Sequence, residues 1–146
     1  MPGHHIDLNR SAWQTWAAVH GQDRYDDSEG LVTGRDSLTD LEWDGVRAVT
    51  GDVAGRDVLH VQCHLAFDAI TLARRGARVT GVDFAPAALA KARDLATRCG
   101  VDLELVEGDA TDLPAEADGR HRLRIGGYCV PVLYTLIAER PAEHPA

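Results

Sequence analysis

The chain has 146 residues, a length typical of a single domain. Hydrophobic residues make up 45% of it and charged residues 26%, which is enough apolar side chain for a packed core and argues against global disorder. The formal net charge of −8 argues against nucleic-acid binding, because phosphates are held by clustered lysine and arginine side chains.

The three cysteines, Cys63, Cys99 and Cys129, are odd in number and include no Cys-x-x-Cys pair. This pattern argues against a disulfide framework or a zinc finger, so we expect free thiols in a reducing compartment. The first ten residues lack the apolar stretch of a signal peptide. No segment reaches the roughly 18 apolar residues that a membrane span needs. We therefore expect a cytoplasmic protein that contacts neither nucleic acid nor membrane.

Residues 1–56 predict a helical arm. In residues 9–20, Trp13, Trp16 and Ala17 recur at three-to-four spacing, which predicts a helix with an aromatic stripe.

The rest of the arm is less regular. Residues 21–36 are polar, contain glycine and predict a loop, and residues 38–50 predict a second helix. Residues 51–56 are a turn-rich connector.

Residues 57–117 predict a β-α-β-α-β core. Short apolar strands alternate with helices rich in alanine: the strands are predicted at 57–61, 78–82 and 103–106, and the helices at 66–75 and 86–99. Pro86 fits the first helical position, and Gly76 and Gly100 follow the helix ends. The alternation predicts an α/β fold with an open, Rossmann-like parallel sheet and right-handed crossovers.

Ligands of open parallel sheets bind beyond the carboxyl ends of the strands. The candidate binding residues at these ends are Gln62, Cys63 and His64 after the first strand, Asp83 and Phe84 after the second, and Asp109 and Ala110 after the third.

An adenosine would fit these residue types. Asp83 lies 21 positions after Gln62, a spacing at which a carboxylate accepts hydrogen bonds from ribose hydroxyls. Phe84 would lie against the adenine ring, the Asp109 carboxylate would accept from its amine, and the Ala110 N–H would serve a ring nitrogen. The alternative is that both aspartates merely cap the turns or helices that follow them.

Several motifs carry a family resemblance. The stretches GARVTGVDFAPAALAKAR (76–93) and GDATDLP (108–114) resemble the second motif and the post-third-strand segment of class I S-adenosylmethionine-dependent methyltransferases. The first loop departs from the family's D-x-G-x-G-x-G pattern. It is similar instead to a subgroup pattern, L-H-L-Q-C-H-F-G-x-D, which is matched at Leu59, His60, Gln62, Cys63, His64 and Asp68. Asn9, Arg10 and Trp13 match that subgroup's N-R-x-x-W start.

The resemblance implies S-adenosylmethionine as cofactor and a small molecule as methyl acceptor. It assigns the methionine part to Gln62, Cys63 and His64, the ribose to Asp83, the adenine face to Phe84, and the adenine edge to Asp109 and Ala110.

Two positions depart from the pattern. Ala66 replaces the subgroup's glycine, which would allow positive φ and close approach to the cofactor, so we expect its methyl group to crowd the methionine end. Ala85 replaces a serine that the family often has and that caps the second helix of the core.

The remaining chemistry-bearing residues have simpler interpretations. Trp13, Trp16 and Tyr25 would contribute to a lid over the substrate, or would pack the N-terminal helix on the sheet, which we expect for Trp16. His60, Cys63 and His64 lack a fourth converging ligand, so no metal is expected. No catalytic base is identified.

The family pattern is lost after residue 117. Residues 118–146 form an atypical tail in which Pro131 interrupts the apolar stretch 128–137. We therefore expect a truncated or frame-shifted methyltransferase, whose first strand is an exposed edge prone to self-association. Two rivals stay open: a non-catalytic remnant or interaction protein, and a nicotinamide-binding oxidoreductase. The absence of G-x-G-x-x-G at 62–67 counts against the second.

Overall fold

The computed structural model describes residues 3–20, 26–109, 122–125 and 128–131. The chain divides into two compact units, Met1–Leu113 and Pro114–Ala146, which are described separately below. None of the helices in these described stretches has the length and apolar character needed to span a bilayer.

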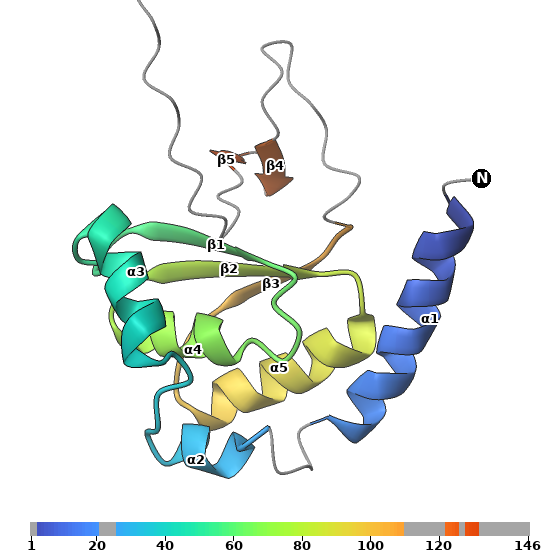
Figure 1. Ribbon diagram of the computed structural model, residues 1–146, viewed down its shortest axis with the longest axis horizontal. Coiled ribbons are helices and arrows are strands. Elements are labelled where there is room, and N and C mark those ends of the chain that lie inside the picture. The colour runs from blue at the N-terminus through green and yellow to red at the C-terminus, as the bar shows by residue number, and fades with distance from the viewer. Residues whose placement is uncertain (1–2, 21–25, 110–121, 126–127, 132–146) are drawn as a thin grey trace, which may run out of the picture. The chain divides into compact units, whose positions relative to one another are not determined.

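The first unit contains a parallel sheet in the order β1-β2-β3 (Figure 1). The strands are β1 (Asp57–Val61), β2 (Arg78–Asp83) and β3 (Glu104–Glu107). The crossovers are α4 (Phe67–Arg74) and α5 (Pro86–Arg98). These bounds lie within one or two residues of the predicted ones, and the predicted partial Rossmann-like α/β fold is confirmed.

The core lies between the sheet and the two crossover helices. Leu72 of α4, Val79 of β2 and Leu89 of α5 belong to one buried cluster, so both helices cover the same face of the sheet. Gly81 in the central strand permits this packing. A Cβ atom there would lie 2.7 Å from Leu105 Cδ2 and 2.9 Å from Cys63 Sγ, closer than packed atoms tolerate.

In the described residues before the sheet the chain forms three helices: α1 (Gly3–Val19), α2 (Ser28–Val32) and α3 (Asp40–Thr50). α1 and α3 confirm the predicted helices. The prediction of a loop throughout 21–36 is wrong in part, because α2 forms there. The Asp27 carboxylate accepts from the Gly30 N–H at 2.8 Å and caps this short helix. α3 begins with a capping box, in which Thr39 and Glu42 bond each other's backbone N–H.

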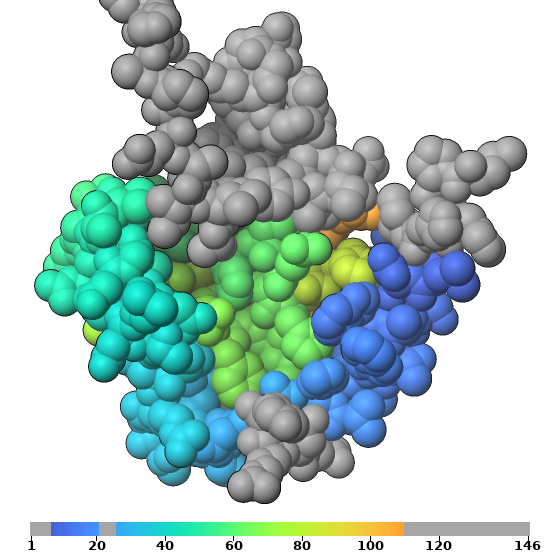
Figure 2. Space-filling view, viewed as in Figure 1, coloured from blue at the N-terminus to red at the C-terminus, as the bar shows by residue number. Residues whose placement is uncertain are grey.

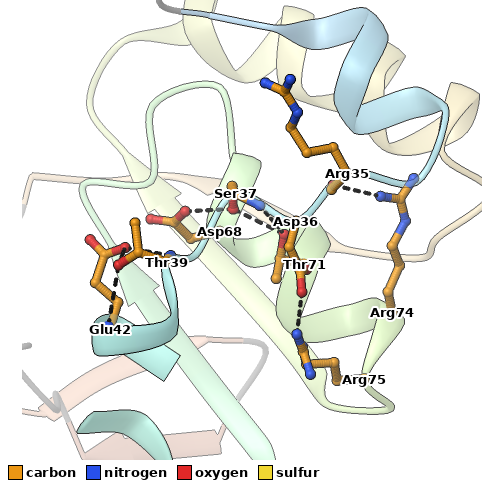
Figure 3. A network of polar contacts seen from close by, with 9 residues as sticks. All are labelled: Arg35, Asp36, Ser37, Thr39, Glu42, Asp68, Thr71, Arg74 and Arg75. Atoms are coloured by element: carbon orange, nitrogen blue, oxygen red, sulfur yellow. Dashed lines mark hydrogen bonds and ion pairs between the residues drawn. The ribbon is translucent and has the colours of Figure 1, made fainter. Parts of the chain in front are cut away.

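A polar network fastens the segment before α3 to α4 (Figure 3). The Ser37 hydroxyl donates to the Asp68 carboxylate at 2.7 Å and lies 2.9 Å from the Thr71 hydroxyl. Thr71 is fully buried, and its hydroxyl also accepts from the Ser37 backbone N–H. Arg75 adds an ion pair with Asp36. The first turns of α4 are thereby tied to the N-terminal arm.

The second unit contains one described hairpin. Strands β4 (Arg122–Ile125) and β5 (Tyr128–Pro131) pair antiparallel, with Ile125 opposite Tyr128. Pro131 ends β5, as expected of a residue that cannot donate to a ladder.

Candidate functional site

The turn after β1 has an unusual backbone. Gln62, His64 and Ala66 all adopt positive φ, at 57°, 49° and 62°, a left-handed region that non-glycine residues rarely occupy. The turn is held by two backbone bonds, since Cys63 N–H donates to the Val82 carbonyl at 3.0 Å and Ala66 N–H to the Cys63 carbonyl at 2.7 Å. Ala66 thus adopts the positive φ that the subgroup's glycine would allow.

Asp83, at the end of β2, accepts two backbone hydrogen bonds. Its Oδ2 takes the His64 N–H at 2.8 Å, and its Oδ1 takes the Ala85 N–H at 2.9 Å. The residue is 6% exposed, so these bonds satisfy a buried carboxylate. The Asp83 carbonyl also accepts from the Gly108 N–H at 3.0 Å, which links the ends of β2 and β3. Asp83 is thus the point at which all three strand ends meet.

The helix α5 after Asp83 begins as expected. Ala85 occupies the N-cap position without a side-chain hydrogen bond, and Pro86 stands in the first turn.

Arg10 of α1 reaches the other predicted binding residues. Its guanidinium carbon lies 5.8 Å from the centre of the Phe84 ring. Its Nη2 lies 3.9 Å from Asp109 Oδ2, an ion pair between side chains that are 42% and 20% exposed. Phe84 and Asp109, predicted to read the face and the edge of one adenine, therefore lie beside a common neighbour.

Helix α1 packs along the start of α5 (Figure 2, blue against yellow and green). The Gln14 side chain accepts from the Ala87 N–H at 3.2 Å, and Lys91 donates to the carbonyls of Ala18 and His20 at 3.0 and 2.8 Å. Ala17 is fully buried in the same contact.

Aromatic rings join the arm to the first loop. The His64 ring makes edge contacts with Trp13 at 5.4 Å and His20 at 4.9 Å. His20 Nδ1 in turn lies 2.6 Å from Asp26 Oδ2. The expectation that Trp16 packs on the sheet is wrong, because Trp16 is 52% exposed and its described ring contact is with Trp13. Tyr25 lies outside the described residues.

Burial shifts the pKa values of the titratable side chains in and beside the turn after β1. Desolvation lowers the pKa of His60 and of His64 below 6.5, and the neighbouring His20 adds to the shift at His64. Burial, with a contribution from Asp83, raises the pKa of the Cys63 thiol to about 12, so this cysteine stays a neutral thiol. Cys63 and Cys99 are free, and the side chain of Cys129 lies outside the described part.

The structure thus brings together most of the predicted site. Gln62, Cys63, His64, Asp83, Phe84 and Asp109 line the adjoining strand ends, whereas Ala110 lies outside the described residues. Sequence reasoning missed the contacts of Arg10 and His20 with this site; the helical spacing of α1 gave no sign of which face meets the sheet edge. Within the described stretches no group of three or more histidine, cysteine or acidic side chains is arranged to hold a metal ion.

Residues 58–125 match the family model of a methyltransferase domain. The part of the chain that carries the parallel sheet is therefore similar to this family. The match begins inside β1 and ends with β4, and so contains the carboxyl ends of β1, β2 and β3.

Solved methyltransferases are similar to part of the chain. An amino pentose methyltransferase from Micromonospora echinaspora shares 29% identity over 65% of this chain and 34% of its own, with a TM-score of 0.39. Magnesium protoporphyrin IX methyltransferase from Synechocystis PCC 6803 shares 19% over 62% and 48%, with a TM-score of 0.43. The tRNA (uracil-54, C5)-methyltransferase from Pyrococcus abyssi shares 30% over 45% and 17%, with a TM-score of 0.39. The chain therefore spans less than half the length of each, and no curated protein matches it.

Proposed function

We propose that the chain binds S-adenosylmethionine at the carboxyl ends of β1, β2 and β3 and transfers its methyl group to a small molecule. One observation carries the proposal. In a segment that matches a methyltransferase domain, the Asp83 carboxylate accepts from the backbone N–H of His64, in a turn after β1 where Gln62, His64 and Ala66 adopt positive φ. The carboxyl edge of a parallel sheet is where such folds bind nucleotides.

The residues at this edge suit the parts of the cofactor. An ionised carboxylate has about four acceptor sites, so the two backbone bonds leave Asp83 able to accept from ribose hydroxyls. The backbone of Gln62, Cys63 and His64 would hold the methionine part.

The adenine would lie against the Phe84 ring, which is only partly buried. Its edge would be held by Asp109 and Ala110.

The cofactor supplies an electrophilic methyl group on a sulfonium sulfur. The chain's own contribution is to hold the methyl donor and the acceptor side by side. This raises the effective concentration of the acceptor at the methyl group. The desolvated His64 and Cys63, both neutral, keep further charge out of the loop beside the proposed methionine part.

The proposal extends to organisation and location. We propose an N-terminal arm at 1–56, a cofactor-binding core at 57–117 and a distinct tail at 118–146, in a cytoplasmic protein. Free thiols at Cys63 and Cys99 support a reducing compartment. Among the described residues of the first unit β1 pairs with β2 alone, which supports self-association through its other edge.

Calorimetry with S-adenosylhomocysteine tests the cofactor. We expect saturable one-to-one binding to the wild type and a loss of at least about fivefold in Phe84→Ala, because base stacking on an aromatic ring contributes about 1–3 kcal/mol. Leu41→Ala, at an exposed position on α3, is the matched control and should bind as the wild type does.

NADH in excess should not displace the ligand. Displacement by NADH would favour the nicotinamide enzyme. An absence of any binding would overturn the proposal in favour of a non-catalytic remnant or interaction protein.

A further inference from the structure

We propose that Arg10 occupies the place of the adenine in the free protein, so that cofactor binding requires its displacement. This inference rests on the proposed function, because it concerns the same site. Arg10 contacts two residues assigned to the adenine: its guanidinium lies over the Phe84 ring and pairs with Asp109.

The distances leave no room for both groups. Stacked planar groups need about 3.5–4.0 Å between carbon atoms, so an adenine between Phe84 and Arg10 would need a separation of about 7 Å. The observed distance from the guanidinium carbon to the ring centre is 5.8 Å. Asp109 must likewise exchange the Arg10 cation for the adenine amine. The guanidinium resembles adenine in being planar and in carrying N–H donors, so it can occupy the same place.

The Arg10 side chain, rather than the helix, is the group free to move. Helix α1 is held to α5 at Gln14, Ala17 and the carbonyls that Lys91 caps. Arg10, in contrast, is 42% exposed, and its ion pair is close to the longest distance at which such pairs form. Its Nε is buried without a hydrogen-bond partner among the described residues, which disfavours the position it holds.

Displacement lowers the affinity of the free protein for the nucleoside, because the cation–π contact and the ion pair must first be broken. An exposed cation–π contact and a surface ion pair together lower affinity about fivefold. Salt screens the ion pair, so the penalty should shrink as ionic strength rises.

The test measures binding of S-adenosylhomocysteine and of adenosine to the wild type, Arg10→Ala and Arg10→Met. Methionine keeps an apolar stem at the position and guards against a packing defect. We expect both variants to bind both ligands about fivefold more tightly. Raising NaCl from about 0.05 to 0.5 M should tighten binding to the wild type and leave the variants unchanged. Arg47→Ala, which removes an exposed arginine of α3, should match the wild type at every salt concentration.

Weaker or unchanged binding in both variants, beside clear binding to the wild type, would overturn this inference and leave the proposed function standing. Weaker binding would show that Arg10 instead clamps the bound nucleoside. Failure of all the proteins to bind either ligand would overturn the proposed function, and the inference with it. Binding to the variants alone would support both.

Discussion

Asp83 and His64 are joined by a 2.8 Å hydrogen bond from the backbone N–H of one to the carboxylate of the other, across 19 residues of chain. The bond connects the end of β2 to the turn after β1. It places a buried carboxylate at the centre of the proposed site. This carboxylate stabilises the turn after β1 whether or not a ligand is bound.

Asp83→Ala should therefore destabilise the fold itself. The substitution leaves the N–H groups of His64 and Ala85 without their acceptor, at a cost of about 3 kcal/mol in the free energy of unfolding. Urea denaturation followed by circular dichroism measures the change. Asp102→Ala, at an exposed position before β3, should stay within about 0.5 kcal/mol of the wild type. Equal stability of the two variants would show that the Asp83 bonds contribute little.

Gln62→Gly should stabilise the chain. A left-handed non-glycine residue costs roughly 1–2 kcal/mol, and the extra freedom of glycine in the unfolded chain offsets about 0.5–1 kcal/mol of the gain. Gln62 is exposed, so no packing is lost, and we expect the free energy of unfolding to rise by about 0.5–1 kcal/mol. Gln62→Ala, which keeps the strain, should show no such gain in the same denaturation experiment.

Ala66→Gly should leave the free energy of unfolding almost unchanged. Relief of strain there is opposed by the loss of a fully buried methyl group, which contributes about 0.8 kcal/mol. If Ala66→Gly raised the free energy of unfolding as much as Gln62→Gly does, this account would be wrong.

Stability should fall as the solution becomes acidic. His60 and His64 have folded-state pKa values below 6.5, chiefly because burial disfavours the imidazolium. Below about pH 6.5 these histidines take up protons in the unfolded chain but not in the folded chain. The free energy of unfolding is therefore highest above this pH and decreases as the pH falls below it. Denaturation midpoints between pH 5 and 8 measure the slope. His64→Gln should flatten it, and an unchanged slope in that variant would show that His64 is not responsible.

Cys63 should resist alkylation in the folded protein. Its thiol is buried and has a pKa of about 12, so almost no thiolate exists at neutral pH. Treatment with iodoacetamide followed by mass spectrometry should show Cys99, which is only partly buried, modified well before Cys63. In urea both should react at similar rates. Early modification of Cys63 in the native state would indicate that the first loop opens readily.

The fold could be predicted closely because its signals are local. Pro86, Gly76 and Gly100 mark the helix ends, and short apolar runs mark the strands. Helix α2 escaped prediction because five residues are too few to display a helical period, although Asp27 before Ser28 and Glu29 is a recognisable capping signal.

The site could be predicted less completely. That residues 62–64, 83, 84 and 109 gather at one edge follows from the parallel topology alone. The partners of Asp83 and the placement of Arg10 do not, because they depend on contacts between distant segments: Gln14 of α1, for instance, meets Ala87 of α5 across 73 residues.

The docking of α1 on α5 has a consequence for how the chain is made. During synthesis, Ala87 and Lys91 emerge more than seventy residues after the helix they secure. At about 5–20 residues per second, the newborn helix waits roughly 4–15 seconds for its partner. Throughout that interval Ala17, which is fully buried once α1 has docked, stays exposed to solvent, to chaperones and to neighbouring nascent chains.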